Sequence, residues 1–352
     1  TGTSGLSAVS TGTVQTFQVS GKVYRLASGS LLSGATMTLA PIREGYSFAS
    51  GTLAVMNSDD TGGFSESLRA VLSATSGAAA VTGGTVNMLV AGSSDSSTLR
   101  ASLVSPGTAG TVNGVVTVGY FSDGTGTTGG TLFSVGTSTV ALTGDVYRLA
   151  VGTLGATSIN LGNIRQGGTF SVSDVIVRNV ARSDDNFSDD LGAVISTTGA
   201  WVSSGSVSGL QAGGTVSSGG LLIGYNPSVS TGTAYGVLNG AAIVTYTSQG
   251  KVAGLGNVSP LVASQTLLVS GTVYQAGSLS LNADYTALGY IDIGHVRLNS
   301  AGTFQTGTVT LTNGAQIGMY SDDLIITPTT AGSLAFTGGS PFALGAGAGG
   351  QL

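Results

Sequence analysis

Carboxylates near the middle of the chain are the residues best suited to chemistry. Asp184, Asp185, Asp189 and Asp190 stand in one short stretch, and Asn186 adds an amide oxygen between them. Hard oxygen ligands of this kind suit Ca²⁺. The D-x-D-x-D-G spacing of an EF-hand loop is absent, so the alternative interpretation is a set of solvated loop carboxylates. These four aspartates are the candidate Ca²⁺ ligands, and the sequence indicates no other cofactor.

Residues for nucleophilic catalysis are scarce. The chain has no cysteine and one histidine, His295. A Cys-His pair is therefore impossible, and only His295 could serve a serine triad. Equivalent positions earlier in the chain hold Pro41 and Asn163, which favours a structural histidine. Adjacent loop aspartates do not suggest the cleft of a glycoside hydrolase. We expect no enzymatic activity.

Two other patterns have a functional and a structural interpretation. The run from Gly124 to Gly129 fits GxGxxG, but that fingerprint needs a helix N-terminus after it, and here another strand is expected, which favours a turn. Trp201, the one tryptophan, could stack on a sugar. A lone aromatic residue in a strand more often packs in or beside the core.

Composition narrows the class of protein. The 352 residues include 59 glycines, only 8% are charged, and mean hydropathy is +0.37. The chain is too apolar for a disordered protein. Its 11 lysines and arginines are spread thinly along the sequence. The chain therefore does not have the concentrated basic surface that binding to a nucleic acid needs, and we expect no nucleic-acid partner. No apolar run is long enough for a transmembrane helix, and residues 1–20 do not have the pattern of a signal peptide.

One short sequence motif occurs three times along the chain. Residues 21–27, GKVYRLA, return as GDVYRLA at 144–150 and as GTVYQAG at 271–277. The spacing is that of a domain rather than of a short solenoid unit. Each copy follows an alternating run that ends in glycine, so the phrase marks the joint between modules. The expected division is a surplus final strand at 1–21, modules at 22–144 and 145–271, and a partial module at 272–352.

Strands are expected nearly everywhere. Alternating runs rich in β-branched and aromatic residues predict strands, and the clusters of Gly, Ser, Thr, Asn and Asp between them predict turns. Ser-Asp-Asp recurs at 58–60, 183–185 and 321–323 and aligns the copies. Beyond residues 334–336 the tail is rich in glycine, and residues 345–350 are expected to be too flexible for a strand. The fold class is all-β: tandem Ig-like antiparallel β-sandwich modules, the last one incomplete.

The phrases VYRLA, NIRQGG, FSESL and SDGTGTTGG resemble the tandem modules of bacterial surface proteins of the choice-of-anchor D family. That resemblance covers nearly the whole chain and implies Ig-like sandwiches on a bacterial cell surface. These phrases are structural and specify no ligand. An export signal and a sorting tail, usual in the longer members, are absent from this sequence.

The sequence favours a structural subunit of an extracellular fibre. Val14, Phe17 and Val19 alternate on the surplus strand and are expected to fill the incomplete sheet of the third module in an adjacent copy. Such a head-to-tail contact does not close, so it gives a filament of identical subunits. An adhesin or carbohydrate-binding module, recognising a ligand near Asp184 to Asp190 or Trp201, is the first alternative. A fragment of a longer array is the second.

Overall fold

The computed structural model describes residues 12, 15–226, 235–281, 308–330, 332 and 341–351. In this part of the chain every named element is a strand, and no helix is long and apolar enough to span a membrane. The all-β fold class is therefore confirmed. Contacts divide the chain into two compact units, Thr1–Tyr147 and Arg148–Leu352. His295 lies outside the described residues.

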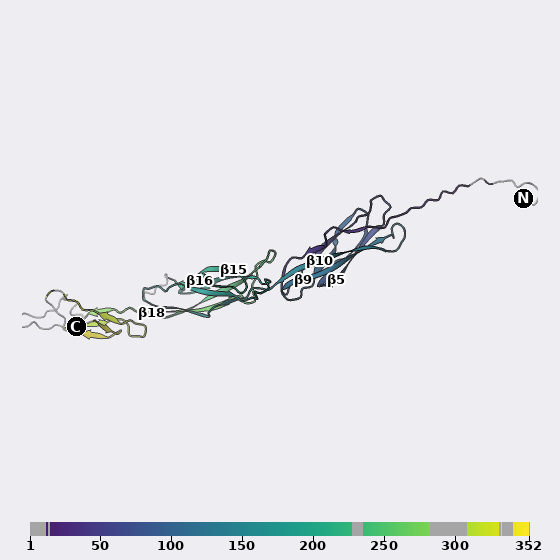
Figure 1. Ribbon diagram of the computed structural model, residues 1–352. Coiled ribbons are helices and arrows are strands. Elements are labelled where there is room, and N and C mark those ends of the chain that lie inside the picture. Colours follow the sequence, from purple (N-terminus) through teal and green to yellow (C-terminus); the bar gives the residue numbers. More distant parts are fainter. Residues whose placement is uncertain are drawn as a thin grey trace, which may run out of the picture. The chain divides into compact units, whose positions relative to one another are not determined.

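The first unit is a sandwich of two sheets (Figure 1). One sheet has the order β1-β4-β8-β6, and the other has the order β2-β10-β9-β5-β7, with β3 also pairing β10. The strands are β1 Gly29–Leu31, β2 Thr36–Thr38, β3 Ile42–Arg43, β4 Gly51–Asn57, β5 Ser67–Gly77, β6 Ala79–Val81, β7 Thr85–Leu89, β8 Ser94–Leu103, β9 Gly110–Asp123 and β10 Phe133–Tyr147.

The second unit begins with the second sandwich, whose eight strands pair in the order β11-β13-β16-β15-β14-β17-β18-β12. They are β11 Gly152–Leu154, β12 Ser158–Arg165, β13 Ser173–Asn179, β14 Asp190–Thr197, β15 Trp201–Leu210, β16 Thr215–Tyr225, β17 Gly236–Gln249 and β18 Ser264–Tyr274. Inward side chains alternate with outward ones along each long strand, and the inward ones form a core separate from that of the first unit. This alternation is what the period-two runs of the sequence predict.

Short strands follow in the same unit. They are β19 Leu279–Leu281, β20 Thr310–Asn313, β21 Leu324–Ile326, β22 Phe342–Leu344 and β23 Gly349–Gln351. β20 lies between β19 and β23, and β21 pairs with β22. The prediction that the Gly-rich tail forms no strand is wrong, because β23 pairs antiparallel with β20 from Thr310↔Gln351 to Thr312↔Gly349. Ladder hydrogen bonds need only the main chain, and a Cβ at Gly350 would lie 2.9 Å from the Phe342 ring.

The glycines of the second and third copies of the repeated motif lie inside strands. β10 runs through Gly144 to Tyr147, and β18 runs through Gly271 to Tyr274. A Cβ at Gly144 would lie 2.5 Å from the Phe48 ring, and one at Gly271 would lie 2.5 Å from the Phe170 ring. Each glycine therefore makes room for an aromatic ring of its own sandwich. The first compact unit ends after Tyr147, just beyond Gly144, and the expected division into modules stays a prediction.

Candidate functional site

A buried asparagine ends the same strand in all three repeats. Asn179 Nδ2 donates to the carbonyls of Asp189, at 3.2 Å, and Leu210, at 3.0 Å, while its Oδ1 accepts from the backbone N–H groups of Val151 and Ala181. Asn57 makes the same four contacts with Glu66, Leu89, Ser28 and Asp59, and Asn313 makes them with Asp322, Leu344, Ser278 and Ala315. Each asparagine thus holds several backbone segments together at one end of its module.

Sequence reasoning did not identify these asparagines. The available signal was an aliphatic residue two positions before the asparagine: Val55-Met56-Asn57, Val177-Arg178-Asn179 and Leu311-Thr312-Asn313. Because buried amides must satisfy their hydrogen bonds, recurrence at a strand end indicates a structural role rather than a ligand. Each buried asparagine and its four backbone partners form a corner of the module. These corners fix the loops that hold the candidate aspartates.

A buried carboxylate lies beside each of the first two corners. Glu66 accepts from the Ser122 hydroxyl at 2.7 Å, and Ser122 Oγ in turn accepts from the Ala27 backbone N–H at 2.7 Å. Asp189 accepts from Ser248 at 2.9 Å, and Ser248 Oγ accepts from the Ala150 N–H at 2.8 Å. The carboxylate and the serine tie the start of each sandwich to β9 or β17. Asp189, one of the four Ca²⁺ candidates, therefore lies in the interior.

The other three candidates are each paired with a cation. Lys251 Nζ lies 3.1 Å from Asp190, and Arg148 lies 2.7 Å from Asp185. Asp184 pairs with Arg182. The Arg182 guanidinium lowers the pKa of Asp184, and the Phe187 backbone N–H, followed by Arg148, lowers the pKa of Asp185. These contacts divide the four aspartates among different partners.

No group of three or more acidic or histidine side chains within the described ranges is arranged to hold a metal ion. An ion that used Asp184 and Asp185 would have to compete with Arg182 and Arg148 for the same oxygens. The Ca²⁺ site stays a prediction, and calcium titration tests it below.

The third repeat shows that the Ser-Asp-Asp alignment is wrong. Gln275 pairs with Ser321 in an isolated bridge, as Arg148 pairs with Ser188 and Arg25 with Ser65. Asp322 therefore corresponds to the buried Asp189 and Glu66, not to the loop residues Asp59 and Asp184. Asp322 is partly exposed and pairs with Arg165. Short polar motifs such as Ser-Asp-Asp recur in turns that are not equivalent, so the sequence alone could not show which acidic residues of the three repeats correspond.

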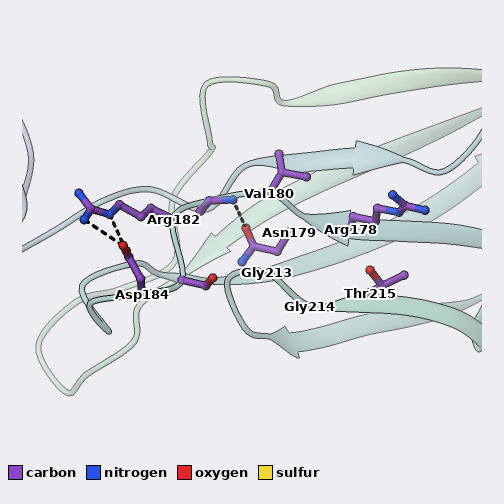
Figure 2. A pocket seen from close by; sticks show the side chains of 10 residues that line it. Arg178, Asn179, Val180, Arg182, Asp184, Gly213, Gly214 and Thr215 are labelled. Carbon is purple, nitrogen blue, oxygen red and sulfur yellow. Dashed lines mark hydrogen bonds and ion pairs between the residues drawn. The ribbon is translucent and has the colours of Figure 1, made fainter.

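A pocket lies beside the Asn179 corner (Figure 2). It is an open hollow of about 560 Å³ between the end of β13 and the loop that precedes β16. Arg178 and Arg182 both line it, but they extend in opposite directions, and Arg182 is paired with Asp184 (Figure 2). Its charged groups do not converge on one ligand position.

Trp201 belongs to the core. It is 3% exposed and packs against Phe170 and Tyr225, with ring centroids 5.8 and 5.9 Å apart. This confirms the packing interpretation and removes Trp201 as a sugar platform. The GxGxxG stretch forms a turn between β9 and β10, in which the N–H groups of Thr127 and Gly129 donate to the Gly124 carbonyl. A strand follows it, so no helix N-terminus is available there.

The segment before the first sandwich carries exposed apolar side chains. Residues 15–24 form no strand within the chain, and Val14 lies outside the described residues. Phe17 is 82% exposed, Val19 94% and Val23 89%. The strand expected at residues 14–21 is therefore absent from the described part of that segment, since it has no neighbouring strand to pair with.

The segment has two close counterparts in the same chain. Aligned on the repeated phrase, Phe17 matches Val140 and Leu267, Val19 matches Leu142 and Val269, and Val23 matches Val146 and Val273. All six counterparts are buried, on β10 and β18. Val14 matches Thr137 and Ser264, which are exposed. The inward face of this pattern thus consists of Phe17, Val19, Gly21 and Val23 and does not include Val14.

Solved structures similar to this chain include proteins with several cadherin domains in tandem. Extracellular cadherin domains 1–4 of protocadherin gamma B7 align at 10% identity and a TM-score of 0.34, covering 92% of this chain and 68% of that one. Human protocadherin-24 EC1-2 aligns at 13% and 0.33, covering 71% and 98%. Drosophila N-cadherin EC1-4 aligns at 11% and 0.29, covering 71% and 50%. Similarity this low assigns no ligand, partner or activity.

No protein-family model matches the chain, and no curated protein matches it. The fold is that of tandem Ig-like sandwiches, while the resemblance to the choice-of-anchor D family stays a prediction.

Proposed function

We propose that this chain is a structural subunit of an extracellular fibre, in which residues 15–24 of one copy complete a sheet of the third module in the next. The observation that carries the proposal is the exposure of Phe17, Val19 and Val23, at 82%, 94% and 89%, where the matching side chains of β10 and β18 are buried. The same pattern of apolar residues is buried in β10 and in β18 but exposed to solvent in residues 15–24.

Burial of this face would contribute a favourable free energy to association. Covering a Phe or Val side chain stabilises by roughly 1.5–3 kcal/mol, so three of them contribute several kcal/mol before ordering costs. β10 pairs antiparallel with β9 and parallel with β2 and β3, and β18 pairs likewise with β17 and β12. A strand inserted in this manner would gain ladder hydrogen bonds on both sides.

Apolar side chains in the third group of strands support it as the receiving site. Leu279 of β19 and Ile325 of β21 are exposed, and so are Ile317 and Met319 in the loop between β20 and β21. Exposed apolar side chains next to strand edges favour pairing with another chain. A second copy supplies a strand whose inward pattern suits a sandwich of this kind.

Substitutions on the two faces of the segment test the proposal. Phe17→Asp with Val19→Asp places two charges on the inward face, whereas Thr16→Asp with Gln18→Asp places them on the outward face, whose counterparts Thr139, Ala141, Thr266 and Leu268 are exposed. Light scattering and electron microscopy should show loss of filaments for the inward pair only. Equal polymerisation of both variants, or equal loss, would refute strand complementation.

A peptide of residues 12–24 provides the second arm of the test. Added to the intact chain, it should shorten filaments by occupying the receiving site, while a peptide carrying Phe17→Asp and Val19→Asp should not. If the unsubstituted peptide did not shorten the filaments, another surface would have to join the subunits.

A further inference from the structure

A groove of about 330 Å³ crosses the outer face of the first sandwich. Its floor is the outward side of β9, with Thr117, Gly119 and Phe121, and one wall is β5, with Arg69 and Val71. Thr137 of β10 and Leu132, which precedes that strand, border the other side. The groove faces away from the core, so packing of the sandwich does not account for it.

Gly119 makes the hollow. It pairs with Val71 on one side and with Thr137 on the other, so it lies at the centre of three strands. Phe121 leans toward it, since a Cβ at Gly119 would lie 3.3 Å from that ring. The main chain of β9 is hydrogen-bonded to both neighbours here and offers no free edge to a peptide strand. A ligand would be recognised by side chains.

Arg69 supplies the positive charge of the groove. It lies opposite Phe121 in the β5–β9 ladder, and its Nε is buried with no hydrogen-bond partner in the described structure. The Thr125 hydroxyl, at 2.6 Å, and the Thr125 backbone N–H donate to Asp123 Oδ1 and lower the pKa of Asp123, and the Arg69 charge lowers it further. A guanidinium that carries an N–H without an acceptor costs free energy, and a carboxylate that pairs with the Arg69 guanidinium from the groove would stabilise its charge.

The second sandwich shows that the fold does not need these residues. The β14–β17 ladder places Gly192 opposite Thr247 and Val194 opposite Thr245, where the first has Arg69 opposite Phe121 and Val71 opposite Gly119. Only the valine is kept. The guanidinium, the aromatic ring and the glycine hollow are therefore particular to the first sandwich.

We propose that this groove binds a uronic acid unit of an acidic polysaccharide. The sugar carboxylate pairs with Arg69, the apolar face of the ring packs on Phe121 and Leu132, and a ring hydroxyl bonds with Thr137. The groove has the size of a small-ligand site, which is about 300 Å³ or more. An acidic peptide would fit less well, because the strand main chain has no free donor or acceptor for its amides.

Isothermal titration of the full chain with oligogalacturonate tests the proposal, with a malto-oligosaccharide of equal length as the uncharged comparison. Oligogalacturonate should bind, and Arg69→Gln should weaken it at least about tenfold, as expected for loss of a charge-assisted pair. Phe121→Thr and Gly119→Thr, which install the residues of the second sandwich, should weaken it as well. Thr247→Ala, at the position in the second sandwich that matches Phe121, should leave affinity unchanged.

Retention of the wild-type thermal transition in the Arg69→Gln chain would show that weaker binding does not come from unfolding, and Arg69→Lys should recover part of the affinity. Equal binding of the charged and uncharged oligosaccharides would overturn the proposal. So would the absence of binding to oligogalacturonate, or binding of poly-glutamate as tight as that of oligogalacturonate. Filament formation should be the same in all of these variants, which separates this site from the assembly segment.

Discussion

Replacing Asn179 by alanine removes a side chain that holds four backbone groups of the second sandwich. The carbonyls of Asp189 and Leu210 lose a donor, and the N–H groups of Val151 and Ala181 lose an acceptor. Asn179 is buried, so water cannot reach these groups without local opening. The second sandwich should therefore be strongly destabilised.

The expected magnitude follows from the four hydrogen bonds. A net contribution of about 1 kcal/mol each gives about 4 kcal/mol. Total stabilities of domains lie at about 5–15 kcal/mol, so the loss is a large fraction of the whole. Asn57 makes the same four contacts in the first sandwich, which provides a matched comparison within one chain.

Trp201 makes the measurement specific. It is the one tryptophan of the chain and is buried in the second core, so its emission during urea unfolding reports that sandwich. The midpoint should fall in Asn179→Ala with an unchanged m value. Asn57→Ala should leave the Trp201 transition within about 0.5 kcal/mol of wild type, because the two cores are separate.

Two results would refute this reasoning. A loss below about 1 kcal/mol for Asn179→Ala would mean that the four backbone groups find other partners, since one hydrogen bond alone is worth that much. An equal shift of the Trp201 transition in Asn57→Ala would mean that the two sandwiches do not unfold independently.

Three further predictions use the same chain. Gly271→Ala should destabilise the second sandwich by about 1–3 kcal/mol through overpacking, because its Cβ would lie 2.5 Å from the Phe170 ring. Gly256→Ala is the control, since a Cβ there meets no atom within 4 Å. Similar urea midpoints of the Trp201 emission for both variants would contradict this prediction. Burial raises the pKa of Tyr246 to about 12, above the ordinary value of about 10, so Tyr246 loses its proton first in the unfolded state. The free energy of unfolding should therefore fall as pH rises from about 10 to 12, and Tyr246→Phe should reduce that fall. Identical pH profiles of stability for the wild type and the variant would contradict this. If Ca²⁺ binds Asp184 and Asp185, millimolar Ca²⁺ should raise Tm in wild type and not in Asp184→Asn with Asp185→Asn; a flat response in wild type would mean that Arg182 and Arg148 keep these carboxylates.

The sequence by itself determined the all-β class and the recurrence of modules. Both depend on local pattern: period-two alternation buries every second side chain, and a motif such as VYRLA that returns at the spacing of a domain indicates a repeated module. It also indicated that residues 14–20 repeat a final strand, because Phe17 and Val19 fall on the phase of Val140 and Leu142. These inferences need no knowledge of which strands become neighbours.

The tertiary structure decided what individual polar residues do. Asp189 and Asp190 are adjacent in sequence, yet one is buried against Ser248 and the other pairs with Lys251, and both partners lie far along the chain. The groove at Gly119 likewise depends on strands β5 and β10 arriving on either side of β9. Hydrogen bonds and ion pairs act over a few ångströms between residues distant in sequence, so register and strand order set them, and a linear pattern carries neither.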